Sequence, residues 1–258
     1  MTVIVLGPSL GTTGPTLWSG VATRLLDAPA GAPQLEPMAW DLPGHGGERR
    51  PVPAELTMAD LARRVLDDLD ERGVDRFHYA GDSVGGAVGL QLLLDAPERV
   101  LSATLLCTGA RIGTAASWQE RAAQVRASGT PSLVAASAAR WFVPGFVERQ
   151  PDAASALLHA LSDADDAGYA AVCHALEHFD VRERLAEIAA PVLAVAGAHD
   201  VATPPDSLRE IAEGVQAGRL VVLDDVAHLA PAEAPEQVAR LIRDHVASAT
   251  DAGERALR

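Results

Sequence analysis

Residues 79–86 read Tyr-Ala-Gly-Asp-Ser-Val-Gly-Gly and contain a G-x-S-x-G motif centred on Ser83. Before the motif, residues 76–80 form a short aromatic run that is typical of a buried strand, and after it the apolar residues 87–94 predict a buried helix. A sharp strand-to-helix turn of this kind strains the serine backbone and exposes the hydroxyl, and the helix N-terminus favours negative charge. We therefore predict that Ser83 is a nucleophile; the alternative is a plain structural turn.

A nucleophilic serine also needs a base and an acid that orients the base, because its hydroxyl is weakly reactive at its ordinary pKa. In chains built around such a turn, the acid and then the histidine follow the serine, each in a loop after a later strand. Residues 192–196 read as a strand that leads into Asp200, and residues 219–223 read as a strand that leads into His228. We predict that His228 takes the proton of Ser83 and that Asp200 orients His228.

The choice of His228 has rivals, since the chain contains eight histidines. His199 adjoins Asp200 and is the main rival, but it precedes the acid in the chain. His45, in a loop, is expected to brace a turn. The remaining histidines are expected to pack inside the fold or to face solvent: His78, His159, His174, His178 and His245. Three further carboxylates are expected to be solvated loop residues, namely Asp206, Asp224 and Asp225.

An oxyanion hole for this chemistry requires two backbone N–H groups, one from the residue after the nucleophile and one from a loop after an early strand. The first is that of Val84. The second is expected in the loop after the strand 2–6, where Pro8 has no N–H to donate. Leu10 is the predicted donor and Ser9 the second choice; the alternative is an ordinary glycine-rich turn.

Composition bounds the class of protein. The chain has 258 residues, 48% of them hydrophobic, which suits one α/β domain with an insert. Its formal net charge of −14 disfavours nucleic-acid binding. It has no run of eighteen apolar residues, and residues 1–5 lead directly into a strand, so we expect no membrane span, no signal peptide and a cytoplasmic location. Cys107 and Cys173 lack metal-like spacing and are expected to be reduced thiols, and no metal or organic cofactor is expected.

Strand-like and helix-like segments alternate along the chain, which predicts a mostly parallel, doubly wound sheet. A helix is expected from Thr57 to Arg72, with Thr57 and Asp60 as an N-cap pair. Residues 1–112 and 186–258 are assigned to the α/β core. The Ala-rich residues 113–185 interrupt the alternation and are predicted to form a helical cap over the active site. The six expected strands are Thr2–Leu6, Glu36–Trp40, Arg76–Ala80, Leu101–Cys107, Val192–Ala196 and Arg219–Leu223.

These features together resemble the α/β-hydrolase superfamily over nearly the whole chain, and more narrowly the 3-oxoadipate enol-lactonases. The narrower resemblance implies hydrolysis of a small enol-lactone to a 3-oxo dicarboxylate through an acyl-enzyme. It rests on cap and loop stretches: residues 9–12 with Trp18, 110–114 with Trp118, 139–144, 168–171, 175–176, 179–180 and 197–205.

Three features depart from this resemblance. The chain starts at what resembles the third strand of the fold, so the first two strands are expected to be absent and one sheet edge to be uncovered. Asp82 precedes the nucleophile, where an apolar residue is more usual, and an extra negative charge there would raise the pKa of His228. Pro8 replaces the more usual polar residue.

An anionic substrate of a chain with this net charge needs a local positive clamp, and arginine suits a carboxylate because it donates two parallel hydrogen bonds. We predict that Arg111 and Arg140 bind the carboxylate and that Trp141 walls the pocket; the alternatives are surface salt bridges and a cap-core anchor. Other functions remain open within this fold: a general carboxylesterase, a carbon–carbon bond hydrolase or a cofactor-free perhydrolase. A non-catalytic ligand-binding module is the remote alternative.

Overall fold

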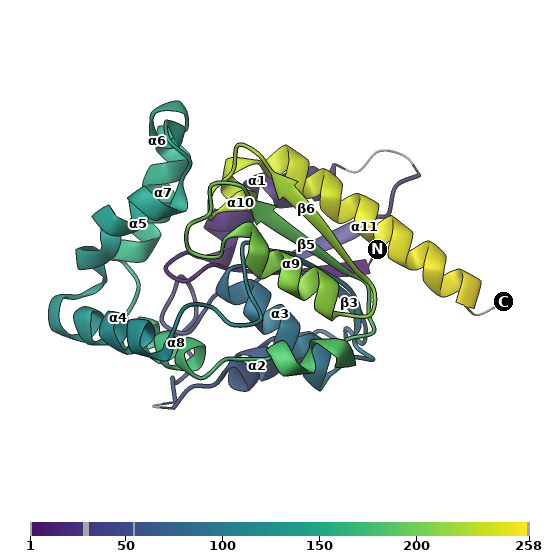
Figure 1. The fold of residues 1–258 in the computed structure, drawn as a ribbon, viewed down its shortest axis with the longest axis horizontal. Coiled ribbons are helices and arrows are strands. Elements are labelled where there is room, and N and C mark those ends of the chain that lie inside the picture. Colours follow the sequence, from purple (N-terminus) through teal and green to yellow (C-terminus); the bar gives the residue numbers. More distant parts are fainter. Residues whose placement is uncertain (1, 28–30, 54, 257–258) are drawn as a thin grey trace.

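A six-stranded sheet forms the centre of the computed structural model, which describes residues 2–27, 31–53 and 55–256. All neighbouring strands run parallel, in the order β2-β1-β3-β4-β5-β6 (Figure 1), as the alternation of segments predicts. Each strand lies within two residues of its expected bounds. The strands are β1 (Thr2–Gly7), β2 (Leu35–Ala39), β3 (Phe77–Asp82), β4 (Val100–Leu106), β5 (Val192–Gly197) and β6 (Gly218–Leu223).

Helices cover both faces of this sheet (Figure 1). α1 and α11 pack together on one face, and α2, α3 and α9 lie on the other. The predicted cap of α2 is confirmed: the Thr57 side chain accepts from the N–H of Asp60, and the Asp60 carboxylate accepts from the N–H of Thr57. Their bounds are α1 (Gly14–Leu26), α2 (Met58–Glu71), α3 (Val84–Asp95), α9 (Pro205–Gly214), α10 (Ala230–Glu233) and α11 (Pro235–Ala256).

The segment between β4 and β5 is helical and extends beyond one end of the sheet (Figure 1). Within it α4 packs against α8, and α5 packs against α7. The predicted cap boundary at residue 185 falls inside the 3₁₀ helix Arg182–Glu187. The other bounds are α4 (Ala115–Ser128), a 3₁₀ helix (Thr130–Leu133), α5 (Val134–Trp141), α6 (Phe146–Arg149), α7 (Pro151–Ser162) and α8 (Asp166–Glu177).

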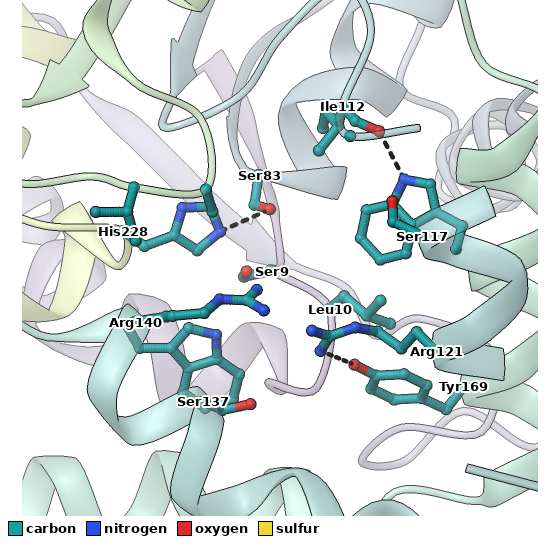
Figure 2. Close-up of a pocket in the computed structure, with 15 residues that line it drawn as sticks. Ser9, Leu10, Ser83, Ile112, Ser117, Arg121, Ser137, Arg140, Tyr169 and His228 are labelled. Carbon is teal, nitrogen blue, oxygen red and sulfur yellow. Dashed lines mark hydrogen bonds between the residues drawn. The ribbon is translucent and has the colours of Figure 1, made fainter. Parts of the chain in front are cut away.

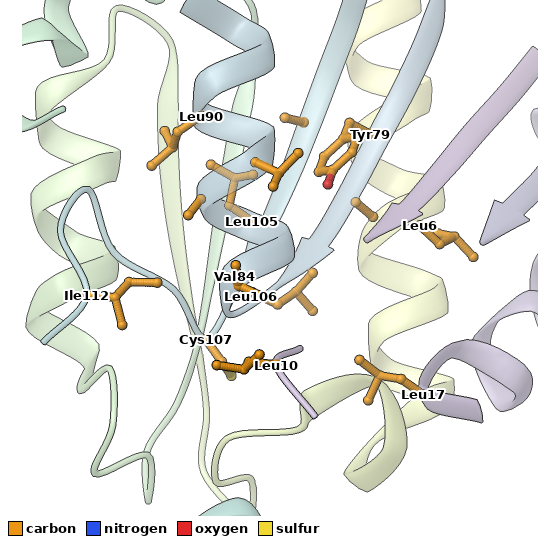
Figure 3. Packing of buried hydrophobic residues seen from close by; sticks show 14 of the residues in the cluster. Leu6, Leu10, Leu17, Tyr79, Val84, Leu90, Leu105, Leu106, Cys107 and Ile112 are labelled. Atoms are coloured by element: carbon orange, nitrogen blue, oxygen red, sulfur yellow. The ribbon is translucent and has the colours of Figure 1, made fainter. Parts of the chain in front are cut away.

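Strand β3 and most of helix α3 are buried in the hydrophobic core. Val84 and Leu90 on α3 pack in the same buried cluster as Leu105 and Leu106 of β4 (Figure 3). Helix α3 is largely apolar, nine of its twelve residues are buried, and it directly follows the predicted nucleophile. The core therefore fixes the turn on which Ser83 lies. Among the described residues, no helix is both long enough and apolar enough to cross a membrane.

Candidate active site

Ser83 lies at the turn between β3 and α3 with φ 54° and ψ −117°, in the left-handed half of backbone space that side chains rarely occupy. The turn is tight because Gly81 and Gly85 approach each other: a Cβ on Gly81 would lie 2.3 Å from the carbonyl oxygen of Gly85. Tyr79 donates to that carbonyl through its hydroxyl at 2.7 Å. Thr108 donates to the carbonyl of Ser83 at 2.6 Å. The strained serine is thus held by its surroundings.

Ser83, His228 and Asp200 meet at the carboxyl ends of β3, β6 and β5. The Nε2 atom of His228 lies 3.0 Å from Ser83 Oγ (Figure 2). Its Nδ1 atom lies 2.8 Å from Asp200 Oδ2. The three residues are 7%, 4% and 3% exposed. When Nδ1 donates its proton to Asp200, Nε2 is free to accept the proton of the serine hydroxyl.

Asp200 is held as a carboxylate by donors around it. Burial alone would raise its pKa, but the neighbouring His228 and hydrogen bonds from Thr203 outweigh burial and lower the pKa below its ordinary value. Oδ1 accepts from the N–H groups of Ala202 at 2.8 Å and Thr203 at 3.1 Å, and Oδ2 accepts from the Thr203 hydroxyl at 2.7 Å. The ionised form favoured here is the form that orients an imidazole.

Among residues 9–12 of the loop after β1, one N–H group is available for an oxyanion. Ser9 donates its N–H to the Thr12 hydroxyl, Thr12 donates to the carbonyl of Ser9, and Gly11 donates to His45 Nε2. Within the described part of the chain, the N–H of Leu10 has no such acceptor, and Ser9, the second choice, is already engaged. Leu10 and Ser9 both line the cavity next to Ser83.

His45 braces this loop, which is the role expected of it. Its Nδ1 lies 2.9 Å from the carbonyl of Pro43, so Nδ1 carries the proton and Nε2 accepts from Gly11. Burial lowers the pKa of His45 and favours this neutral form, despite opposing contributions from its carbonyl partner and two carboxylates.

Among the described histidines, His228 alone lines the cavity next to Ser83. His199 is exposed, and its N–H donates to the carbonyl of Val226. His78 contacts Ser102 within the sheet, and burial lowers its pKa to about 4. The three alternative carboxylates are all exposed: Asp206, Asp224 and Asp225.

A cavity of about 310 Å³ opens over Ser83 and His228. The helices between β4 and β5 supply its other side, with Trp118 and Arg121 from α4, Ser137, Arg140 and Trp141 from α5, and Tyr169 from α8. The guanidinium groups of Arg121 and Arg140 point into the same space from the side opposite Ser83 (Figure 2). A volume of this size suits a small molecule.

Neither cavity arginine is paired with a carboxylate within 4.0 Å in the described part of the chain. Arg121 Nη1 lies 3.4 Å from the hydroxyl of Tyr169, which accepts from it. Burial and the nearby Arg121 lower the pKa of Arg140. A guanidinium stays charged even so, and two unpaired charges in a shared cavity attract an anion.

The predicted substrate-binding residues are only partly brought together. Arg140 and Trp141 line the cavity, whereas Arg111 is exposed and is not part of the lining. Arg121 takes the place expected for Arg111. Its signal in the sequence is its spacing of three from Trp118, which puts both residues on one face of a helix.

The surroundings of Asp82 do not fit the expectation that this residue adds a negative charge beside Ser83. Its side chain is completely buried, and neither carboxyl oxygen has a hydrogen-bond partner among the residues that the structure describes. Burial, followed by the nearby Asp200 and Glu233, raises its pKa well above the ordinary value. The environment therefore favours the uncharged acid, because a buried charge without partners is costly.

The fold and the serine–histidine–carboxylate geometry are typical of one class of enzymes. The sequence model of a family described as "alpha/beta hydrolase fold" matches residues 4–235, so the chain belongs to the α/β-hydrolase family. The comparisons support a hydrolase of this fold.

Individual relatives of the chain carry the names of two kinds of hydrolase. The chain is 35% identical over 199 residues to 3-oxoadipate enol-lactonase 2 of Acinetobacter baylyi, covering 77% of this chain and 74% of the relative. It is 29% identical to a putative carbamate hydrolase RutD of Pseudomonas savastanoi pv. phaseolicola, covering 83% and 84%. The crystal structure of the enol-lactonase from Burkholderia xenovorans LB400 superposes with a TM-score of 0.89 at 29% identity, covering 95% of this chain and 91% of that one.

Proposed function

We propose that this hydrolase opens a small enol-lactone that carries a carboxylate, of the 3-oxoadipate enol-lactone type, through an acyl-enzyme on Ser83. The proposal is carried by Arg121 and Arg140, which face Ser83 across a small cavity and pair with no carboxylate in the part of the chain that the structure describes. Relatives named as enol-lactonases support the same substrate class.

In the first step the Oγ atom of Ser83 attacks the lactone carbonyl while His228 Nε2 takes the hydroxyl proton. Asp200 stabilises the imidazolium that forms and keeps the ring oriented. The N–H groups of Val84 and Leu10 donate to the developing oxyanion, and the N-terminus of α3 adds a favourable field.

Collapse of this intermediate breaks the ring C–O bond, and the enol oxygen receives the proton from His228. The opened enol stays attached to Ser83 as an ester and tautomerises to a ketone. Water, deprotonated by His228, then attacks the ester carbonyl. The bond between the acyl carbon and Ser83 Oγ breaks, Oγ takes the proton back from His228, and the 3-oxo dicarboxylate is released. No redox step or co-reactant other than water is needed.

Arg140 and Arg121 hold the carboxylate that the substrate already carries. A planar guanidinium donates two parallel hydrogen bonds to a carboxylate, and the half-buried cavity weakens competition from water. Trp141 and Trp118 form the apolar walls beside it. The clamp thereby sets the distance from the carboxylate to the reacting carbonyl.

Substitution of the arginines tests the substrate class. We expect Arg140→Ala and Arg121→Ala to raise KM for the carboxylated enol-lactone by about 10- to 100-fold, the loss typical of a hydrogen bond to a charged group. KM for the methyl ester of the same lactone should change little. Arg126→Ala is the matched control, since Arg126 lies exposed on the same helix α4, and Arg111→Ala should also leave KM unchanged.

Several outcomes would contradict the enol-lactone proposal. Equal effects on acid and ester, or faster turnover of neutral esters by the wild type, would favour a general carboxylesterase. Peracid formation with hydrogen peroxide, cleavage of a carbon–carbon bond or faster turnover of a carbamate would point to another reaction of the same site. Absence of labelling by a fluorophosphonate would favour a non-catalytic binding module.

A further inference from the structure

One carboxylate outside the serine–histidine–aspartate group joins two segments that are far apart in sequence. Glu233 is the last residue of α10, five residues after His228. Its Oε1 atom accepts from the N–H of Ala227 at 3.0 Å and of Leu229 at 3.3 Å. These two residues flank His228 on either side. One oxygen of Glu233 thus holds the loop that carries the predicted base.

The other oxygen of Glu233 reaches the helical segment over the cavity. Oε2 accepts from the N–H of Val143 at 2.7 Å. Val143 follows Trp141, which lines the cavity, by two residues. The carbonyl of Trp141 accepts from the N–H groups of His228 at 3.1 Å and Leu229 at 3.3 Å. The loop and the cavity wall are therefore joined by backbone contacts and by one shared carboxylate.

Burying a carboxylate such as that of Glu233 without an opposite charge costs free energy, which its hydrogen bonds must offset. Burial raises the pKa of Glu233, whereas its three backbone donors and the nearby His228 act in the opposite direction. A carboxylate that accepts several N–H groups is a strong and directional acceptor. No side chain of the opposite charge pairs with Glu233 within 4.0 Å in the described part of the chain.

We propose that Glu233 is a positioning residue: it fixes the backbone on both sides of His228 to the cavity wall at Trp141–Val143 and so keeps His228 Nε2 at hydrogen-bond distance from Ser83. Its effect is on the base and is independent of which substrate the cavity takes. A displacement of the base by about 1 Å is enough to cost about 100-fold in rate.

Glu233→Gln tests this role because an amide cannot serve all three donors. If the amide oxygen accepts from Ala227 and Leu229, the NH₂ group faces the N–H of Val143, and that hydrogen bond is lost. In the reverse orientation the hydrogen bonds to Ala227 and Leu229 are lost instead. We expect kcat for p-nitrophenyl acetate and the rate of fluorophosphonate labelling to fall together by about 10- to 100-fold. KM should stay near the wild-type value. Both assays are free of the enol-lactone, so they separate this proposal from the substrate assignment.

Two control variants separate positioning from simple destabilisation. Glu236→Gln changes an exposed carboxylate nearby, and Thr57→Ala removes the N-cap of α2 far from the site. Both should keep wild-type kcat, and Thr57→Ala should do so despite a lower Tm. Unchanged kcat and labelling in folded Glu233→Gln, or an equal loss in Thr57→Ala, would overturn the proposal.

Hydrogen exchange of the wild type provides a readout that does not depend on a variant folding. In the wild type, the amides of Val143, Ala227 and Leu229 should be protected from exchange although they lie outside helices and strands. In Glu233→Gln, exchange should rise in both segments, 141–143 and 227–229. An unprotected Val143 amide in the wild type would show that the link does not form.

Discussion

At the scale of single residues, the backbone of Ser83 combines strain with tight support. A non-glycine residue in such a conformation costs on the order of 1–3 kcal/mol. The hydroxyl of Thr108 and the carbonyl of Leu106 hold the peptide groups of Ser83 on either side, at 2.6 and 2.9 Å. We interpret the strain as the consequence of presenting Oγ to His228 at the mouth of the cavity.

Two substitutions at Ser83 separate chemistry from strain. Ser83→Ala should lower turnover on the order of 10⁴-fold, because no other described group lies at the nucleophile position. Ser83→Gly should be equally inactive but more stable than Ser83→Ala by about 1 kcal/mol, since glycine tolerates positive φ. Turnover of p-nitrophenyl acetate and urea unfolding measure the two effects. More than about a tenth of wild-type activity in Ser83→Ala would contradict the mechanism.

The buried carboxyl of Asp82 has an effect on stability whose sign depends on pH. Its folded pKa is raised, so the folded state holds its proton more tightly than the unfolded state does. Stability is therefore lost as pH rises from the ordinary pKa toward the folded one, by up to about 1.4 kcal/mol per pH unit. Asp82→Asn should match the wild type in this respect near pH 4 and become relatively more stable as pH increases.

Urea unfolding of both proteins from pH 4 to pH 8 measures this difference. A constant gap between them would mean that Asp82 ionises normally in the folded protein. The acidic limb of the pH–rate profile should be the same in Asp82→Asn and the wild type, because an uncharged Asp82 exerts no electrostatic pull on His228. A shift of that limb to lower pH would restore the initial expectation of a charged Asp82.

At the scale of elements, the start of a helix is set locally, whereas its placement over the cavity is not. Helix α4, like α2, begins with a capping box, formed by Thr114 and Ser117. The cap of α2 is local, since Thr57 and Asp60 satisfy each other's backbone N–H groups. The placement of α4 and α5 over the cavity depends instead on their packing against α8 and α7. The local sequence pattern therefore predicts the cap of α2 with precision, but it does not predict how α4 and α5 are oriented over the cavity.

Removing the cap of α2 should affect stability alone. Thr57→Ala leaves the N–H of Asp60 without its acceptor and should lower the free energy of unfolding by about 1 kcal/mol. Thr57→Ser keeps the hydroxyl and is the matched control, with stability close to that of the wild type. Chemical denaturation measures both, and kcat should stay unchanged in each. An altered kcat in Thr57→Ala would reveal coupling between α2 and the site.

At the scale of the whole molecule, the parallel sheet brings three loops that are distant in sequence together at the carboxyl ends of its strands. Parallel strands end on the same side, so residues that follow β3, β5 and β6 meet there even though they span positions 83 to 228. The mechanism proposed for this edge uses only side chains and backbone amides. We expect prolonged treatment with EDTA to leave turnover unchanged, and lost activity restored by a divalent metal would contradict the proposed serine mechanism.

The amino-acid sequence by itself determined the order of Ser83, Asp200 and His228 along the chain and the strand that each of them follows. The turn at Ser83 is set by Gly81 and Gly85 within a few residues, and Asp200 and His228 each follow a recognisable apolar strand pattern. Such features are predictable because they depend on local backbone sterics and on the rule that parallel strands share an end. The contact of His45 with the carbonyl of Pro43 is local in the same sense, whereas its contact with Gly11 spans 34 positions and depends on the assembled fold.

Only the tertiary structure decided which side chains face the cavity and which are buried without partners. Arg121 lines the cavity and Arg111 does not, because the orientation of the helices between β4 and β5 comes from packing between distant segments. Asp82 is enclosed by the core, and Glu233 lies within reach of Val143, 90 positions away. Burial and long-range contacts of this kind arise from the assembled fold, so no local pattern in the chain carries them.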